Sequence, residues 1–229
     1  MAQDLVVSHN LSTAQPQRAT SSTAQRHRFG TADRAYNHSK RLCDIVIALV
    51  LFTAALPLMV TIAALIKADS HGPVLFRQLR YGRNQKPFVI WKFRTMQAHA
   101  SGDDRQATKN DRRVTRIGRF LRTCSLDELP QIYNVLCGDM ALVGPRPHML
   151  WLDDLFCDLV DNYNERYRVK PGITGLAQIS GCRGETSSKS DMRKRLEKDI
   201  EYIENRSLTL DLKILILTLP ALLRRRDAY

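Results

Sequence analysis

The sequence predicts a mainly helical α+β fold with a small β-hairpin, a proline-broken re-entrant membrane helix and interfacial amphipathic helices. Three observations support this prediction. Residues 45–66 carry no charge and are almost entirely apolar. Two β-prone runs, residues 74–80 and 86–94, flank the turn-forming residues 82–85. Several later segments space their apolar residues as amphipathic helices do.

The chain divides into three parts. Residues 1–38 are rich in Ser, Thr, Ala and Gln, have no apolar period and contain no signal peptide, so they are expected to form a disordered tail. Residues 39–68 are expected to form the re-entrant membrane helix. Residues 69–229 then form a cytoplasmic domain that associates with the membrane.

The apolar run 45–66 has the length of a membrane helix. At ~1.5 Å per residue it would extend about 33 Å, enough to cross a hydrocarbon core of ~30 Å. Basic residues precede and follow it, so charge asymmetry does not orient it and both ends are expected on the cytoplasmic side. Pro57 near its middle would bend the helix, as entry and exit through one face require. A spanning helix and a buried core helix are the alternatives.

Basic residues of the second strand form the first candidate site. Lys92 and Arg94 are two positions apart, so they share one face of a strand and could bind a phosphate. The alternative is an edge strand whose basic residues prevent it from pairing with another chain.

The adjacent acids Asp127 and Glu128 form the centre of the candidate site. Arg122 precedes them, the last of three arginines at helical spacing, and Arg146 follows them. A carboxylate beside arginines is expected to have a depressed pKa, stay ionised and serve as a nucleophile or a metal ligand. Ser125 and Glu128 also match a capping box, in which both side chains only close a helix start. Capping and phosphate binding can coexist at one helix N-terminus.

The rest of the chain offers weaker candidates. Residues 97–112 are expected to form a loop, where the pair Asp103 and Asp104 is either a metal site or simply solvated. Residues 149–168 have the apolar stripe of a helix. Arg183, flanked by glycines, is a further candidate for binding phosphate, and a charged helix 190–205 carries Asp199. Residues 208–223 and the following arginines suit an interfacial helix with a basic anchor, or else a core helix.

Composition limits the function classes. A net charge of +12 favours an anionic partner: nucleic acid, anionic lipid or a phosphorylated substrate. Few aromatic residues lie among the basic ones, which disfavours a nucleic-acid groove. The five cysteines include no CxxC pair, which indicates reduced thiols and argues against structural zinc.

The order of motifs resembles the bacterial sugar transferase family, specifically the small monotopic polyprenyl-phosphate hexose-1-phosphate transferases that initiate exopolysaccharide assembly. The resemblance covers residues 40–229. Its motifs are Lys40-Arg41 with Asp44, Gly72-Pro73, Lys92-Phe93-Arg94, Ser125-Leu126-Asp127-Glu128, Gly144-Pro145-Arg146-Pro147, Pro171-Gly172-Ile173-Thr174-Gly175 and Asp211-Leu212-Lys213.

The resemblance implies transfer of a hexose-1-phosphate from a UDP-sugar to undecaprenyl phosphate, with Mg²⁺ as cofactor and UMP as product, at the cytoplasmic face of the inner membrane. Asp127 would be the nucleophile that forms a covalent phosphosugar intermediate, Glu128 would assist, and both would ligate the metal. Binding of the substrate phosphates falls to the basic residues Lys92, Arg94, Arg122, Arg146 and Arg183, and Asp199 is a weaker candidate for the nucleotide end.

The expected partners are a UDP-hexose, undecaprenyl phosphate and membrane lipids, without nucleic acid, and a homodimer is left open. Two rival functions remain. A glycosyltransferase would pass on only the sugar and release UDP, and a membrane-tethered binding module would have no activity at all.

Overall fold

The computed structural model describes residues 31–97, 111–182 and 188–223. The candidates Asp103, Asp104 and Arg183, and the arginines at 224–226, lie outside these residues. The helices and strands follow in the order α1 (Thr31–Asp69), β1 (Leu75–Tyr81), η1 (Arg83–Gln85), β2 (Pro87–Phe93), α2 (Arg116–Cys124), η3 (Leu126–Glu128), α3 (Gln131–Cys137), β3 (Ala141–Val143), α4 (Leu150–Leu159), η4 (Tyr163–Arg168), β4 (Gly172–Thr174), α5 (Leu176–Ile179), α6 (Lys189–Asn205) and α7 (Leu208–Leu223).

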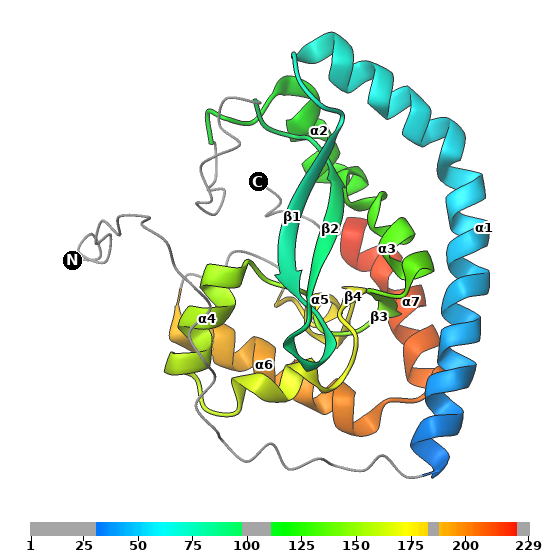
Figure 1. Cartoon of the computed structure of the whole chain (residues 1–229), viewed down its shortest axis with the longest axis vertical. Coiled ribbons are helices and arrows are strands. Elements are labelled where there is room, and N and C mark those ends of the chain that lie inside the picture. Colours follow the sequence, from blue (N-terminus) through cyan, green and yellow to red (C-terminus); the bar gives the residue numbers. More distant parts are fainter. Residues whose placement is uncertain (1–30, 98–110, 183–187, 224–229) are drawn as a thin grey trace.

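Helix α1 runs along one side of the molecule (Figure 1). It begins at Thr31, so residues 31–38 are helical, which corrects their assignment to a disordered tail. Contacts with the C-terminal part of the chain explain the early start. Arg206 donates to Asp33 at 2.7 Å, and the Tyr36 hydroxyl donates to Asp211 at 2.9 Å.

The apolar part of α1 is exposed and continuous. The helix continues through Pro57 without interruption, but it bends part-way along its length, so the expected bend is present although the helix is not broken (Figure 1). Proline removes one backbone hydrogen bond, and the bonds on either side of it maintain the helix. Among the described residues, α1 is the helix long and apolar enough to cross a membrane, and only 11% of its most apolar window is buried. The alternative of a buried core helix is therefore wrong.

The predicted β-hairpin is confirmed. Strands β1 and β2 pair antiparallel from Leu75 opposite Phe93 to Tyr81 opposite Pro87. A second, unpredicted sheet consists of β3 and β4, which pair in parallel through residues 141–143 and 172–174. Gly172 permits this pairing, because a Cβ at that position would lie 2.1 Å from the backbone nitrogen of Gly144. The motif at residues 171–175 therefore contains a strand.

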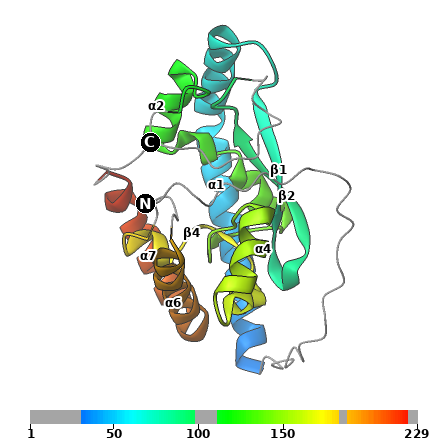
Figure 2. The same ribbon diagram turned by 90° about the vertical axis from the view of Figure 1, so that its left-hand side faces the viewer.

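Three apolar clusters hold the elements together. The largest joins α1, the hairpin, α3, β3, α6 and α7 around Val135 and Met140. A second packs α4 and η4 on α6, and a third packs the end of α1 on α2 through Ile62, Ile66 and Leu121. Figure 2 shows α6 and α7 at one side of the molecule and the hairpin at the other.

The predicted apolar stripe of residues 149–168 is only half buried. Helix α4 ends at Leu159 and is followed by the separate η4. Leu152, Phe156 and Val160 lie in the core. Trp151, Leu155 and Leu159, on another side of the helix, are exposed. A helix packed against one partner buries one face, so the stripe was too wide for the contact that α6 and η4 provide.

Candidate active site

Asp127 and Glu128 lie in η3, a single turn between α2 and α3. Ser125 ends α2 in the left-handed conformation, with φ 57°, and Pro130 precedes the first residue of α3. The side chain of Ser125 makes no capping hydrogen bond in η3, so the capping box is wrong. The irregular backbone frees both carboxylates from the helix and lets them face other parts of the chain.

Glu128 holds two cations from distant elements. Arg146 donates to both of its carboxylate oxygens, at 3.0 Å from Nη1 to Oε2 and more closely from Nη2 to Oε1. Lys92 Nζ donates to Oε1 at 2.9 Å. Burial alone would raise the pKa of Glu128, but the charges of Arg146 and Lys92 hold that pKa well below its usual range. Glu128 is therefore the ionised anchor of the cluster.

Asp127 has the opposite electrostatic environment. Burial, followed by the negative charge of Glu128, raises the pKa of Asp127, while Lys92, Arg122 and Arg146 oppose this rise. The expected depressed pKa is thus wrong for Asp127 and right for Glu128. The carboxyl of Asp127 is half-buried. The cluster can accept further positive charge at this position, since that would favour the ionised carboxylate.

Of the three arginines predicted at helical spacing, Arg122 is the one that reaches the cluster around Asp127 and Glu128. Its Nε donates to the hydroxyl of Thr95 at 2.9 Å, and its charge acts on Asp127. Arg116 and Arg119, on the same helix, are exposed.

Arg94 lies away from the cluster. It is buried and donates to the carbonyls of His71 and Ser70, each at 2.7 Å, which follow the last turn of α1. A cation at this position satisfies carbonyls that the helix leaves without partners. Arg94 therefore caps the end of α1, and these contacts separate its guanidinium from Lys92 and the Glu128 cluster.

Asp199 is also buried away from the carboxylate pair. It forms an ion pair with Arg166 at 3.4 Å, and burial raises the pKa of Asp199 to about 6. Arg166 in turn donates to the backbone carbonyl of Arg146. Sequence reasoning missed Arg166, which joins Asp199, the weaker candidate for the nucleotide end, to the backbone of Arg146.

Two further residues at the site escaped prediction. Arg80, on β1, is close enough to Lys92 to affect the pKa of that lysine, after burial and the charges around Glu128. Strand alternation and hairpin register could have identified it, because Arg80 shares a face with Lys92. Asn134 joins α3 to β2 by accepting from the backbone N–H of Trp91 and donating to the carbonyl of Val89. These bonds hold α3, the helix that follows η3, against the hairpin.

The model of the bacterial sugar transferase family matches residues 35–225. The chain belongs to this family. A UDP-glucose:undecaprenyl-phosphate glucose-1-phosphate transferase from Klebsiella pneumoniae is 50% identical over 192 residues, which are 83% of this chain and 41% of that protein.

Two other relatives have lengths nearer to that of the chain. A Caulobacter vibrioides protein of the same name is 49% identical over 191 residues, which are 83% of this chain and 72% of that protein. The exopolysaccharide production protein PSS of Rhizobium leguminosarum is 42% identical, and 98% of it is covered. The chain spans about two fifths of the length of several other relatives.

The site of this sugar transferase fits a metal ion only in part. Mg²⁺ commonly takes one or two carboxylates and completes its shell with water and substrate phosphates. Asp127 can supply one such carboxylate. Both oxygens of Glu128 are already bonded to Arg146 and Lys92. In the described ranges, no group of three or more His, Cys, Asp or Glu residues could hold a metal. A magnesium site here would therefore depend on Asp127 and on substrate oxygens.

Proposed function

We propose that this sugar transferase moves a hexose-1-phosphate from a UDP-sugar to undecaprenyl phosphate and releases UMP, as the first membrane step of exopolysaccharide assembly. One observation carries the proposal. A half-buried carboxyl, Asp127, lies beside a second acid, Glu128, that fixes Lys92 and Arg146 next to it. The names of the relatives support undecaprenyl phosphate as the acceptor and UDP-glucose as the donor.

The reaction would proceed in two displacements at one phosphorus. A carboxylate oxygen of Asp127 attacks the β-phosphorus of the UDP-sugar, a P–O bond forms, and the bond to the bridging oxygen breaks so that UMP leaves with its electron pair. The phosphate oxygen of undecaprenyl phosphate then attacks the same phosphorus and displaces the Asp127 carboxylate. The sugar phosphate remains on the lipid.

The cations reduce the electrostatic repulsion between the Asp127 carboxylate and the diphosphate of the UDP-sugar. A cation ~4 Å from a charged oxygen contributes about 4 kcal/mol at an effective dielectric near 20. Lys92, Arg122 and Arg146 each lower the pKa of Asp127, so each stabilises the carboxylate that attacks. Glu128 acts by keeping Lys92 and Arg146 in place. Mg²⁺, when bound beside Asp127, would supply further neutralisation of the diphosphate.

The exposed apolar helices support a membrane location. On α1, residues such as Val50 and Val60 are more than half exposed, and on α7 so are Leu212 and Leu219. The acceptor is a membrane lipid whose phosphate stays at the bilayer surface, so the site must lie there. We place the protein at the cytoplasmic face of the inner membrane, with α1 entering and leaving by the same face.

Topology can be measured independently of activity. In a variant without the native cysteines, single cysteines at Gly30 and Lys67 flank the apolar part of α1. Both are expected to react with a membrane-impermeant thiol reagent only after the cells are opened. Labelling of one of the two in intact cells, at the periplasmic face, would show a spanning helix.

The activity itself is tested by incubating the purified chain with undecaprenyl phosphate and a panel of UDP-sugars and identifying the released nucleotide. UMP together with a lipid diphosphate sugar is expected, with UDP-glucose the preferred donor. Release of UDP would indicate an ordinary glycosyltransferase. No nucleotide release with any donor would favour a binding module.

A further inference from the structure

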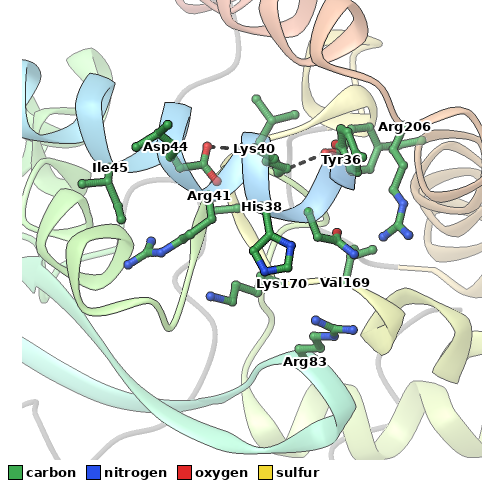
Figure 3. Close-up of a pocket in the computed structure, with 15 residues that line it drawn as sticks. Tyr36, His38, Lys40, Arg41, Asp44, Ile45, Arg83, Val169, Lys170 and Arg206 are labelled. Carbon is green, nitrogen blue, oxygen red and sulfur yellow. Dashed lines mark hydrogen bonds and ion pairs between the residues drawn. The ribbon is translucent and has the colours of Figure 1, made fainter. Parts of the chain in front are cut away.

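A cavity of about 460 Å³ lies beside the first turns of α1 (Figure 3). Four separate parts of the chain bring cations to it: Lys40 and Arg41 on α1, Arg83 on η1, Lys170 just before β4, and Arg206 directly after α6. None of the residues of the Asp127 and Glu128 cluster lines this cavity. It is therefore a site distinct from the candidate active site.

Arg41 is held rigidly at the edge of the cavity. It donates to the carbonyls of Val135 at 2.6 Å and Leu136 at 2.9 Å, in the last turn of α3. Lys170 approaches the same place, since a Cβ on Gly138 would lie 3.3 Å from Nη2 of Arg41 and 3.6 Å from Nζ of Lys170. In Figure 3, the side chains of Arg41, Lys170 and Arg83 extend into the space below α1.

The acids near the cavity neutralise two of its cations, Lys40 and Arg206. Asp211 accepts from Lys40 at 2.9 Å, and Asp33 accepts from Arg206 at 2.7 Å. Asp44, the acid that lines the cavity, lies 3.6 Å from Lys40 and accepts from a backbone N–H.

Lys170 is the cation that this arrangement leaves available. Among residues 31–97, 111–182 and 188–223, its ammonium group has no ion-pair or hydrogen-bond partner. Burial, then the charges of Arg41 and Arg83, lower the pKa of Lys170. An anion between these groups would relieve their repulsion.

Apolar residues continue from the cavity along α1. Leu42 and Ile45 line it, and Leu42 is 65% exposed. Val46, Leu49 and Val50 then follow, each more than half exposed. A fixed guanidinium beside a lysine matches a phosphate group. The apolar residues next to them match the hydrocarbon chains attached to it, and together they match an anionic phospholipid.

We propose that this cavity is a binding site for the phosphate headgroup of a membrane phospholipid, which Arg41 and Lys170 contact while its chains lie along the exposed residues of α1. The lipid would seat the start of α1 at the bilayer surface. This proposal does not depend on the reaction at Asp127, and its test contains no UDP-sugar.

The test follows thermal unfolding of the full chain in uncharged detergent micelles. Phosphatidylglycerol is added, or diacylglycerol with the same chains and no phosphate, or glycerol 3-phosphate with no chains. Phosphatidylglycerol at a hundredfold excess over its dissociation constant should raise the midpoint by about 5 to 10 °C. The other two compounds should raise it much less.

Lys170→Gln should lose the shift caused by phosphatidylglycerol, while Lys86→Gln should keep it. Lys86 is exposed in the hairpin turn and does not line the cavity, so it controls for the loss of one positive charge. Each variant is compared with itself without lipid, so a change in its own stability does not affect the result. Equal shifts in wild type and Lys170→Gln, no shift in wild type, or an equal effect of diacylglycerol or glycerol 3-phosphate would each overturn the proposal.

Discussion

At the scale of single residues, the two adjacent acids have different roles because they face different surroundings. Successive residues of a 3₁₀ turn point about 120° apart. Glu128 faces the core side, where it is 8% exposed and meets Arg146 and Lys92. Asp127 is half-buried, and the ion pairs of Lys92 and Arg146 are with Glu128 instead. The same turn thus separates the ion-paired anchor from the carboxyl that we propose as the nucleophile.

The pair gives a matched prediction. Asp127→Asn should reduce UMP release about 1000-fold or more, the loss typical of a missing nucleophile, with stability unchanged or increased because burial disfavours the ionised form. Glu128→Gln should instead reduce the free energy of unfolding by about 3 kcal/mol, since it leaves two cations without their carboxylate. Urea unfolding and nucleotide assays measure both effects. An Asp127→Asn enzyme with nearly normal turnover would remove the nucleophile from the mechanism.

At the scale of elements, α1 is attached to the rest of the protein at both ends. Arg94 satisfies backbone carbonyls after its last turn. At its start, Tyr36 and Lys40 both donate to Asp211 of α7. The exposed apolar part lies between these attachments, so the two ends of α1 are held by the same folded body. This geometry supports entry and exit through one membrane face.

Truncation tests the N-terminal attachment. A chain lacking residues 1–30 keeps every contact described for α1 and should unfold at the same temperature as the full chain. A chain lacking residues 1–38 loses the contacts of Asp33 and Tyr36 and should be less stable by about 2 kcal/mol. Thermal unfolding in detergent compares the two. Equal stability of both truncated chains would show that the early turns of α1 contribute nothing.

At the scale of the whole molecule, a buried polar network supports the site from behind. His148, Asp153 and Arg166 are buried, and Tyr163 of the second apolar cluster donates to Asp153 at 2.5 Å. Arg166 connects the network to the backbone of Arg146. Groups from α4, η4 and α6 thereby determine where Arg146 lies, and Arg146 determines the position of Glu128.

This network predicts how stability depends on pH. Burial, then Arg166, lower the pKa of His148 to about 3, against an ordinary value of 6.5. Between these values the unfolded chain binds a proton that the folded chain does not, so stability falls as pH decreases from 6.5. Asp199 acts in the opposite direction. Burial raises the pKa of Asp199 in the folded protein to about 6, so the stability that this residue contributes to the fold is lost as pH rises from 3.8 to 6. The two effects partly cancel between pH 4 and 6.

Variants separate the two contributions. His148→Gln should flatten the fall in unfolding free energy between pH 7 and 4, and Asp199→Asn should steepen it, each by at most about 1.4 kcal/mol per pH unit. Comparing slopes, not values at one pH, removes the cost of the substitution itself. Parallel curves for wild type and His148→Gln would show that the histidine is not held neutral.

The sequence by itself determined the features that depend on neighbours along the chain. The apolar run of α1, the hairpin and the adjacency of Asp127 and Glu128 are patterns of a few residues, and local pattern fixes local structure. The arginines near the acids were also visible, because Arg122 precedes the two acids closely in sequence and the Gly144-Pro145-Arg146-Pro147 motif follows them.

Only the tertiary structure decided which charge meets which. Lys92 is 36 residues from Glu128, and Arg94, two residues later, caps α1 instead. The β3–β4 pairing, the buried Asp199 and the cavity between Arg41 and Lys170 likewise join segments far apart in sequence. Such contacts depend on how whole elements pack. A periodic pattern shows which face of an element is apolar, but the partner it meets is set by the packing of the entire chain.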